Sequence, residues 1–335
     1  MPNIIFIIIV LFITSISVGI IGNTIGIGGG ILLVPFFLFY MHMPPLEASG
    51  LSLFTIVAST SGGSLKFIKE KIIDFKLFLM IVLFAVPAAA AGSILSKYIN
   101  TNEFKGIFSF IIIIIGIFSL TATRMQTKRN IHSSHNHNNH NNSNEEADTS
   151  DINARMHNGT VNNDENIETL SGTNNSIDLR LQSVIIYFKH ISSNIKRKRI
   201  DRAGNKYDYY IKKPIAINLF SILAGFISGF IGIGIGGITG TFLTAVEQIP
   251  PRIAFSTIVL AMIFSSVAGG FIHLAYMKLS FKTIIYLIPL MVGAIIGSQV
   301  GAIVSKLLKS RTVRLYQGWI IIVLGFLMFV ISYFK

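Results

Sequence analysis

Cysteine is absent from the 335-residue chain, and tryptophan occurs once. Without cysteine there can be no disulfide, thiolate metal site, iron–sulfur cluster or cysteine nucleophile. Charge is also scarce, because Asp, Glu, Lys and Arg make up 13% of the residues, about half the share in soluble domains. Residues 124–213 hold 14 of the 28 basic and 10 of the 15 acidic side chains. The rest of the chain has too few charges to cover a water-soluble fold, which excludes a soluble globular enzyme.

Apolar runs occupy both sides of this polar segment, and most can cross a hydrocarbon core about 30 Å thick. They lie at about 4–22, 30–42, 48–66, 75–97 and 104–122, and again at 214–231, 235–246, 253–277, 281–304 and 313–333. The second run of each set has only about 12 residues, which suits a half-helix or re-entrant segment. We therefore expect an all-α polytopic membrane protein with four to five membrane segments in each half.

The two halves repeat each other at an offset of 206 residues. The offset aligns Gly26, Gly28, Gly30 and the double proline 44–45 with Gly232, Gly234, Gly236 and the double proline 250–251. Apolar composition alone would not place a glycine cluster and a double proline in one register. Duplicated halves are common in secondary transporters. The expected domains are a first membrane repeat (1–123), a hydrophilic insert (124–213) and a second membrane repeat (214–335).

Basic residues indicate how the chain is oriented. They gather at both ends of the insert and in the loop at 306–314, and the positive-inside rule places these loops in the cytoplasm. The loops are out of phase between the halves, because the first-half counterpart at 97–105 carries few basic residues. This mismatch favours inverted repeats. We expect an integral protein of the plasma membrane with the insert 124–213 in the cytoplasm.

The insert has two parts with different compositions. Residues 130–178 are rich in Asn, His, Ser and acids, so we expect them to be disordered. In residues 179–200, apolar side chains at helical spacing precede the basic run 196–199, which predicts an amphipathic helix. Its basic stretch, 181–199, suits either anionic lipids of the cytoplasmic leaflet or the underside of the protein itself.

Glycine-rich breaks are the strongest candidates for a substrate site. Glycine clusters weaken helices, and an unwound stretch persists in a membrane only inside protein or along a cavity. Backbone N–H groups at a following helix N-terminus attract anions. The candidate binding residues are Asn23, Gly26, Gly28, Gly29, Gly30, Ser228, Gly234, Gly236 and Gly237. His273, the only histidine deep in an apolar run, is a candidate for proton coupling, with a structural role as the alternative.

The glycine cluster at 26–35, GIGGGILLVP, resembles the signature of the sulfite exporter TauE/SafE family. The Pro-Pro-x-x-Ala turn at 44–48 and the Lys-Ile-Ile-Asp turn at 71–74 are similar to that family as well. The second cluster departs from the pattern, because Ile235 interrupts its glycines and Thr241 stands where the first half has Pro35. The resemblance implies a permease for a small sulfur-containing or organic anion.

We therefore expect a non-enzymatic permease that moves such an anion by alternating access and has no cofactor, metal site or nucleic-acid partner. Its expected partners are the anion and membrane lipids, with a homo-oligomer left open. The main alternative is a divalent-metal transporter whose sensor is a histidine-rich loop, formed by His132, His135, His137 and His140. A membrane scaffold is a further alternative. Intramembrane enzymes are disfavoured, since no His-Glu-x-x-His motif or deep Asp pair is present.

Overall fold

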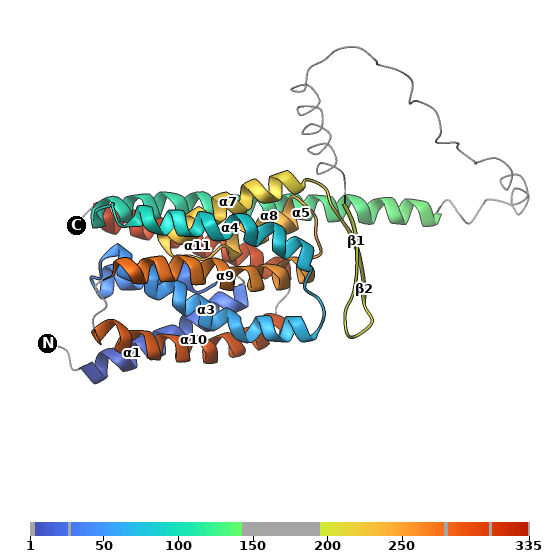
Figure 1. The fold of residues 1–335 in the computed structure, drawn as a ribbon. Helices are drawn as coiled ribbons and strands as arrows, with labels where there is room; N and C mark the ends of the chain where they lie inside the picture. The colour runs from blue at the N-terminus through green and yellow to red at the C-terminus, as the bar shows by residue number, and fades with distance from the viewer. Residues whose placement is uncertain (1–3, 26–27, 143–194, 278–280, 308–309, 334–335) are drawn as a thin grey trace, which may run out of the picture. The chain divides into compact units, whose positions relative to one another are not determined.

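The computed structural model describes residues 4–25, 28–142, 195–277, 281–307 and 310–333. The first half contains α1 (Ile4–Ile25), α2 (Gly30–Pro35), the π-helix η1 (Phe36–Tyr40), α3 (Pro45–Lys69), α4 (Phe75–Ser96) and α5 (Thr101–Asn142). The second contains α7 (Pro214–Ile231), α8 (Gly236–Ala245), α9 (Pro251–Tyr276), α10 (Phe281–Leu307) and α11 (Ser310–Tyr333). Residues 1–124 and 192–335 form one compact unit, which we call the helical unit (Figure 1).

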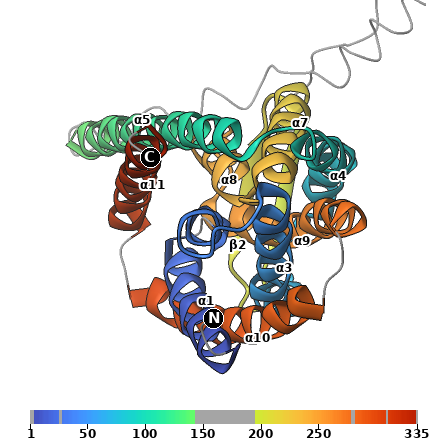
Figure 2. The ribbon, with the colours of Figure 1, turned by 90° about the vertical axis from the view of Figure 1, so that its left-hand side faces the viewer.

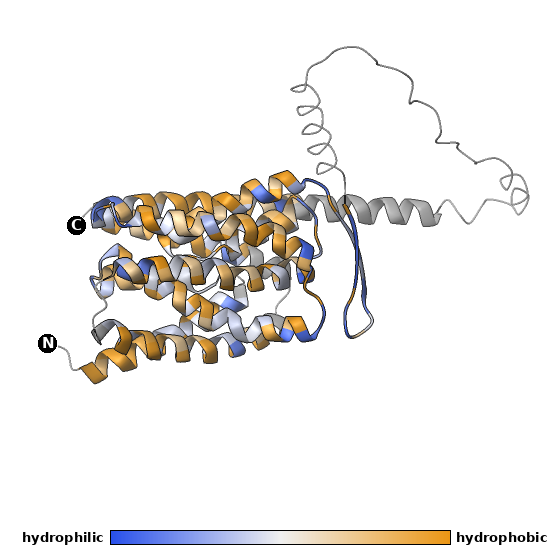
Figure 3. Ribbon diagram, in the orientation of Figure 1, coloured by the Kyte–Doolittle hydropathy of each residue, from blue (hydrophilic) through white to orange (hydrophobic). Residues whose placement is uncertain are grey.

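Eight helices of the described chain are long and apolar enough to cross a membrane, four before and four after the insert. Large apolar side chains on them are exposed, among them Ile13, Leu83 and Phe326, each about 60% accessible. Hydrophobic residues cover these helices along their lengths, whereas hydrophilic residues gather near their ends (Figure 3). In water such exposure would be unfavourable, but in hydrocarbon it is expected. The prediction of a multi-pass membrane protein is confirmed.

The repeat seen in the sequence is also present in the backbone. Gly28 and Gly234, which align at the 206-residue offset, have φ angles of +72° and +76°. His42 and Gln248 also align, and their φ angles of +50° and +62° are unusual for non-glycine residues. The same turn hydrogen bond follows in each half, from Met43 N to Phe37 O and from Ile249 N to Leu243 O, both 3.0 Å long. The two halves therefore share local geometry as well as sequence.

The repeats interlock by exchanging helix partners. Helix α1 packs along α10, while its counterpart α7 packs along α4, the counterpart of α10 (Figure 2). The central helices α3 and α9 are also counterparts and run antiparallel. The end of α3 meets the start of α9 through Glu70 and Arg252, whereas its start packs against the end of α9 through Gly50 and His273. An antiparallel pair of equivalent helices is the arrangement that inverted repeats require.

The last part of one predicted helix, 179–200, is a β-strand instead. Residues 195–200, the end of the expected amphipathic helix, form strand β1 (Ile195–Ile200), which pairs antiparallel with β2 (Lys206–Ile211). Burial alternates along β1 with a period of two, since Arg197 and Arg199 are half-buried while Lys196 and Lys198 are exposed. The aromatic β2 supplies a partner strand. Residues 179–194 lie outside the described residues.

The boundaries of the insert also differ from the prediction. Helix α5 continues to Asn142, so residues 130–142, which we expected to be disordered, are helical. The remainder of that segment, 143–178, lies outside the described residues. Residues 192–213, which the sequence placed in the insert, belong to the helical unit. The membrane part is helical as predicted, and the hairpin adds a two-stranded sheet to it.

Candidate functional site

The two glycine breaks meet inside the helical unit, at a place that we call the glycine crossing. A Cβ atom added to Gly30 would lie 2.5 Å from the carbonyl oxygen of Gly232. Gly28 and Gly234 face the Met262 thioether from opposite repeats, and their positive φ angles favour glycine. Side chains are thus excluded here, and the backbones of two broken helices approach each other directly.

Polar side chains of α3 and α9 surround the end of α7 at this crossing. The Ser52 hydroxyl donates to the Gly232 carbonyl oxygen at 2.7 Å, and Ser49 packs against Gly232. The Nε2 of His273 lies 2.8 Å from the Gly229 carbonyl oxygen. Because a carbonyl only accepts, Nε2 carries the hydrogen, and Nδ1 of a neutral ring is left as an acceptor.

Several polar atoms of α3, α7, α8 and α9, the helices that meet at or beside the crossing, have no hydrogen-bond partner within the part of the chain that the structure describes. They are the hydroxyls of Ser49, Ser228, Thr239 and Ser266, and Nδ1 of His273. All five side chains are fully buried. Buried polar groups in native proteins are nearly always paired, so unpaired groups in one region indicate a place where a polar ligand can bind.

Helix N-termini add donors to these side chains. Helix α8 begins at Gly236, and the N–H groups of its first turn have no acceptor within the helix. Gly236 and Gly237 are buried and place no side chain over these groups. Helix α2 begins in the equivalent way at Gly30. With the macrodipole, such ends favour a negative charge.

The predicted site residues divide into those at the crossing and those away from it. Gly28, Gly30, Ser228, Gly234, Gly236, Gly237 and His273 lie at the crossing or in the helix ends beside it. Gly29 packs against Val18 of its own repeat. Asn23 lies beside Gly301 of α10, and its amide donates to Gly19 of its own helix at 3.1 Å. Gly26 lies outside the described residues.

The sequence analysis missed Ser49, Ser52 and Met262. The two serines are three residues apart, so they lie on one side of α3. That spacing was visible in the sequence. Met262 carried no such indication, because a methionine in an apolar helix is ordinary core.

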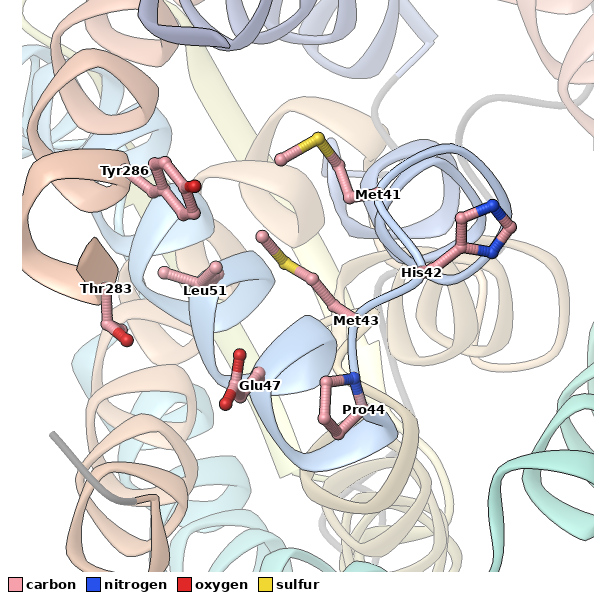
Figure 4. A pocket seen from close by; sticks show the side chains of 8 residues that line it. All are labelled: Met41, His42, Met43, Pro44, Glu47, Leu51, Thr283 and Tyr286. Carbon is pink, nitrogen blue, oxygen red and sulfur yellow. The ribbon is translucent and has the colours of Figure 1, made fainter. Parts of the chain in front are cut away.

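A pocket of about 300 Å³ opens where the turn after η1 and the start of α3 face the start of α10. It lies at the end of α3 away from the hairpin, which contacts the other end at Glu70. In Figure 4, Met41 and Met43 point toward Tyr286, whereas His42 turns away from them. Leu51 lines the pocket and precedes Ser52 in the chain, so the pocket reaches close to the glycine crossing.

Buried carboxylates are confined to the other end. Among the described residues they are Asp74, Asp201 and Glu247, and all three contact the hairpin or its flanking residues. No group of three His, Asp or Glu side chains within the described residues is placed to hold a metal ion. The histidines at 132–140 lie in the part of α5 whose side chains are not described. The structure therefore offers nothing that supports the metal-transporter alternative.

Comparison with known proteins agrees with this geometry. The sequence profile of a family described as "Sulfite exporter TauE/SafE" matches residues 11–149 and 217–335, which is most of the chain. The chain is also similar to the "Probable membrane transporter protein YunE" of Bacillus subtilis (strain 168), with 22% identity over 324 residues that cover 95% of each chain. No solved structure matches. The chain belongs to the sulfite exporter TauE/SafE family and is a membrane transporter of that family.

Proposed function

We propose that this transporter carries a small anion, of the sulfite, sulfonate or carboxylate class, and binds it at the glycine crossing. The observation that carries the proposal is the set of unpaired hydroxyls, led by Ser49 and Ser228, beside the backbone N–H groups of α8. These groups donate hydrogen bonds without bringing a charge of their own. An anion held by such donors needs no cation in the membrane interior.

The charge distribution supports an anion over a cation. A cation carrier usually places a carboxylate at membrane depth. The buried carboxylates of the described chain lie at the hairpin end instead, and Asp74 there is already paired with Arg197. His273 is the one ionisable side chain beside the crossing within the described residues. Its Nδ1, which has no partner among the described residues, can accept a proton that is carried together with the anion.

The packing supports alternating access. Gly28, Gly30 and Ser228 are buried, so an anion can reach them only when the repeats move apart. The pocket between α3 and α10 provides a path from one end, while the hairpin covers the other end. Inverted repeats can exchange these roles, since each end is built from equivalent segments.

A binding assay with a matched pair of serines tests the site. Ser228 and Ser221 lie two turns apart on α7, and both are fully buried. Ser221 already donates to the Ile217 carbonyl oxygen at 2.7 Å, whereas the Ser228 hydroxyl is unpaired. Thermal stability of the purified protein would be measured with sulfite, sulfate, thiosulfate, sulfoacetate, taurine and acetate, and with Zn²⁺ and Ni²⁺.

We expect one anion class to stabilise the protein, by about 2.7 kcal/mol at a concentration of about 100 Kd. Ser228→Ala should weaken that binding about tenfold to a hundredfold, because a hydrogen bond to a charged group contributes about 1.5–3 kcal/mol. Ser221→Ala should bind as the unaltered protein does. Flux into liposomes should be lost in Gly28→Leu. Stabilisation by metals alone, or equal binding by the two serine variants, would remove the basis for the proposed site.

A further inference from the structure

The hairpin lies across the ends of helices from both repeats (Figure 1). On the first repeat, Arg197 donates from Nε to the Asp74 carboxylate at 2.9 Å, and Tyr209 donates to the same carboxylate at 2.5 Å. Asp74 is completely buried and also caps α4. On the second repeat, Arg252 lies 3.2 Å from the Asp201 carboxylate in the hairpin turn. One short segment therefore joins the two halves.

The flanking chain extends the same attachment. The backbone N–H groups of Lys212 and Lys213, just after β2, donate to the buried Glu247 at 3.0 and 3.1 Å. Between the repeats, Asp74 N donates to the Thr257 hydroxyl at 3.1 Å. Each contact uses a charged or polar group, so water can replace it once the segment lifts.

The Asp74 carboxylate at the centre of this network keeps its charge. Burial alone would raise the pKa of Asp74, but the hydrogen bonds from Arg197 and Tyr209 outweigh burial and hold that pKa well below its usual range. The carboxylate therefore stays ionised at physiological pH. Arg197 is 24% accessible, so the pair lies at the edge of the solvent and not in a dry core.

The sequence repeat shows which surface the hairpin covers. The 206-residue offset maps the pocket residues Pro44, Leu51 and Thr283 onto Pro250, Thr257 and Leu77. At the pocket end this surface is open. At the other end Asp74 bonds to both equivalents, through its N–H to the Thr257 hydroxyl and through its carboxylate to the Leu77 N–H. The same carboxylate accepts from Arg197 and Tyr209, so the hairpin is attached directly over these residues. The hairpin thus covers the place where the symmetry of the fold would put a second pocket.

We infer that the β1–β2 hairpin is a latch that closes the second, symmetry-related access path, and that it must release Asp74 before the glycine crossing opens to this end. The inference rests on the proposed function for the identity of the crossing as the binding site. Basic side chains crowd this end, among them Lys66, Lys69 and Lys76, which identifies it as the cytoplasmic side under the positive-inside rule. The latch would therefore control access from the cytoplasm.

The chain has no cysteine, so a single introduced thiol reports access without a background. Ile56 is suitable because it is completely buried and its side chain contacts the positions of both Gly30 and Gly234. The Ile56→Cys protein would be reconstituted in sealed vesicles and treated with an impermeant thiol reagent on either side. Arg197→Ala breaks the latch, and Lys198→Ala is its control, since Lys198 is the next residue of β1 and is exposed.

We expect Arg197→Ala to raise the rate of labelling from the hairpin side about tenfold or more, and Lys198→Ala to change it less than twofold. Labelling from the pocket side should stay measurable in both, which shows that the variant is folded. A hairpin-side rate unchanged by Arg197→Ala would overturn the latch. The assay uses no substrate, so its result is independent of whether an anion binds at the crossing.

A reversible cross-link provides a second test. The Arg202 N–H donates to the Glu70 carbonyl oxygen at 3.0 Å, so these positions on the hairpin turn and the end of α3 are adjacent. In Glu70→Cys/Arg202→Cys, cross-linking by oxidation to a disulfide, or by a short bis-methanethiosulfonate reagent that forms a disulfide with each cysteine, should stop anion exchange. Reduction of the disulfides should restore it. Full exchange in the cross-linked protein would show that the hairpin never needs to lift.

Discussion

Close approach of α4 and α7 leads to a stability prediction whose sign can be worked out residue by residue. At Gly229 of α7, an added Cβ atom would lie 2.6 Å from the Ala89 carbonyl carbon and closer still to its oxygen. Cβ atoms do not approach carbonyl groups so closely, so Gly229→Ala must push the helices apart. The Gly229 carbonyl oxygen also accepts from His273 at 2.8 Å, and that bond would lengthen as α7 moves.

Two effects oppose each other in this variant. Alanine improves helix propensity by about 1 kcal/mol relative to glycine. Overpacking costs about 1–3 kcal/mol, and a weakened buried hydrogen bond costs about 1 kcal/mol more. The expected net loss in the free energy of unfolding is therefore about 1–3 kcal/mol.

Gly106 provides the control, since it lies in α5 and an added Cβ atom there has no neighbour within 4 Å. Gly106→Ala should raise stability by up to about 1 kcal/mol through helix propensity alone. Thermal denaturation of the purified proteins should give the order Gly106→Ala, unaltered protein, Gly229→Ala, from most to least stable. If the two variants were equally stable, α4 and α7 would not be in the contact described above.

Three further predictions concern single side chains. Tyr209→Phe should cost about 1.5–3 kcal/mol in denaturation, because it removes a donor to the buried Asp74 carboxylate. Burial and, second, the bond to Asp74 raise the pKa of Tyr209 in the folded protein. The stability that the Tyr209 hydroxyl contributes is therefore complete below the usual phenol pKa of about 10 and is lost as the pH rises through the higher pKa of the folded state. The stability of Tyr209→Phe should lack this dependence on alkaline pH. Glu47→Gln removes a negative charge from the pocket and should raise the apparent affinity for the anion a few-fold in flux assays, whereas loss of flux would assign Glu47 a part in coupling. His273→Gln keeps a donor for Gly229 but cannot gain a proton, so flux in this variant should lose the pH dependence that the unaltered protein shows; an unchanged profile would make His273 purely structural.

The repeat and the glycine breaks could be predicted because glycine and proline favour few backbone conformations. A glycine cluster and a double proline in matching register leave little choice in how the two halves are aligned. The structure places Gly28 and Gly234 in the same left-handed conformation. The short second segments were predicted for a similar reason, since 12 apolar residues do not span a membrane. α8, for example, has only 10 residues.

The hairpin could not be predicted from local pattern. Residues 195–200 are four consecutive basic residues between two isoleucines, so they show no apolar–polar alternation, and the basic run fits the polar face of a helix. The strand is favoured by a contact that is distant in sequence, because Asp74 binds Arg197 from 123 residues away. Asp74 itself was noted only as part of a turn motif. Its role as the anchor of the hairpin depends on tertiary contacts that no spacing rule contains.

The polar side chains at the crossing do not follow the symmetry of the backbone. The repeat maps Ser49, Ser52, Ser228 and His273 onto Phe255, Ile258, Gly22 and Phe67, none of which offers a polar side chain. Thr239 maps onto Leu33, and Ser266 maps onto Thr60, whose hydroxyl already donates to the Ile56 carbonyl oxygen at 2.7 Å. Among the described residues, the unpaired hydroxyls at the crossing therefore form one set, and two of them, Ser228 and Ser49, lie at the end of α7 and the start of α3.

This asymmetry means that the two breaks contribute differently to the proposed anion site. The first break supplies close backbone approach through Gly28 and Gly30. The donors come from Ser49 on α3, from Ser228 at the end of α7 and from the start of α8 at Gly236. One anion per chain is then expected, bound on one side of the pseudo-symmetry axis. Because the start of α3 also borders the open pocket, the donors face the end that is accessible in this structure. An anion that enters from the pocket end would leave at the hairpin end only after the pocket end closes and the hairpin end opens. The hairpin is attached at the end that must open.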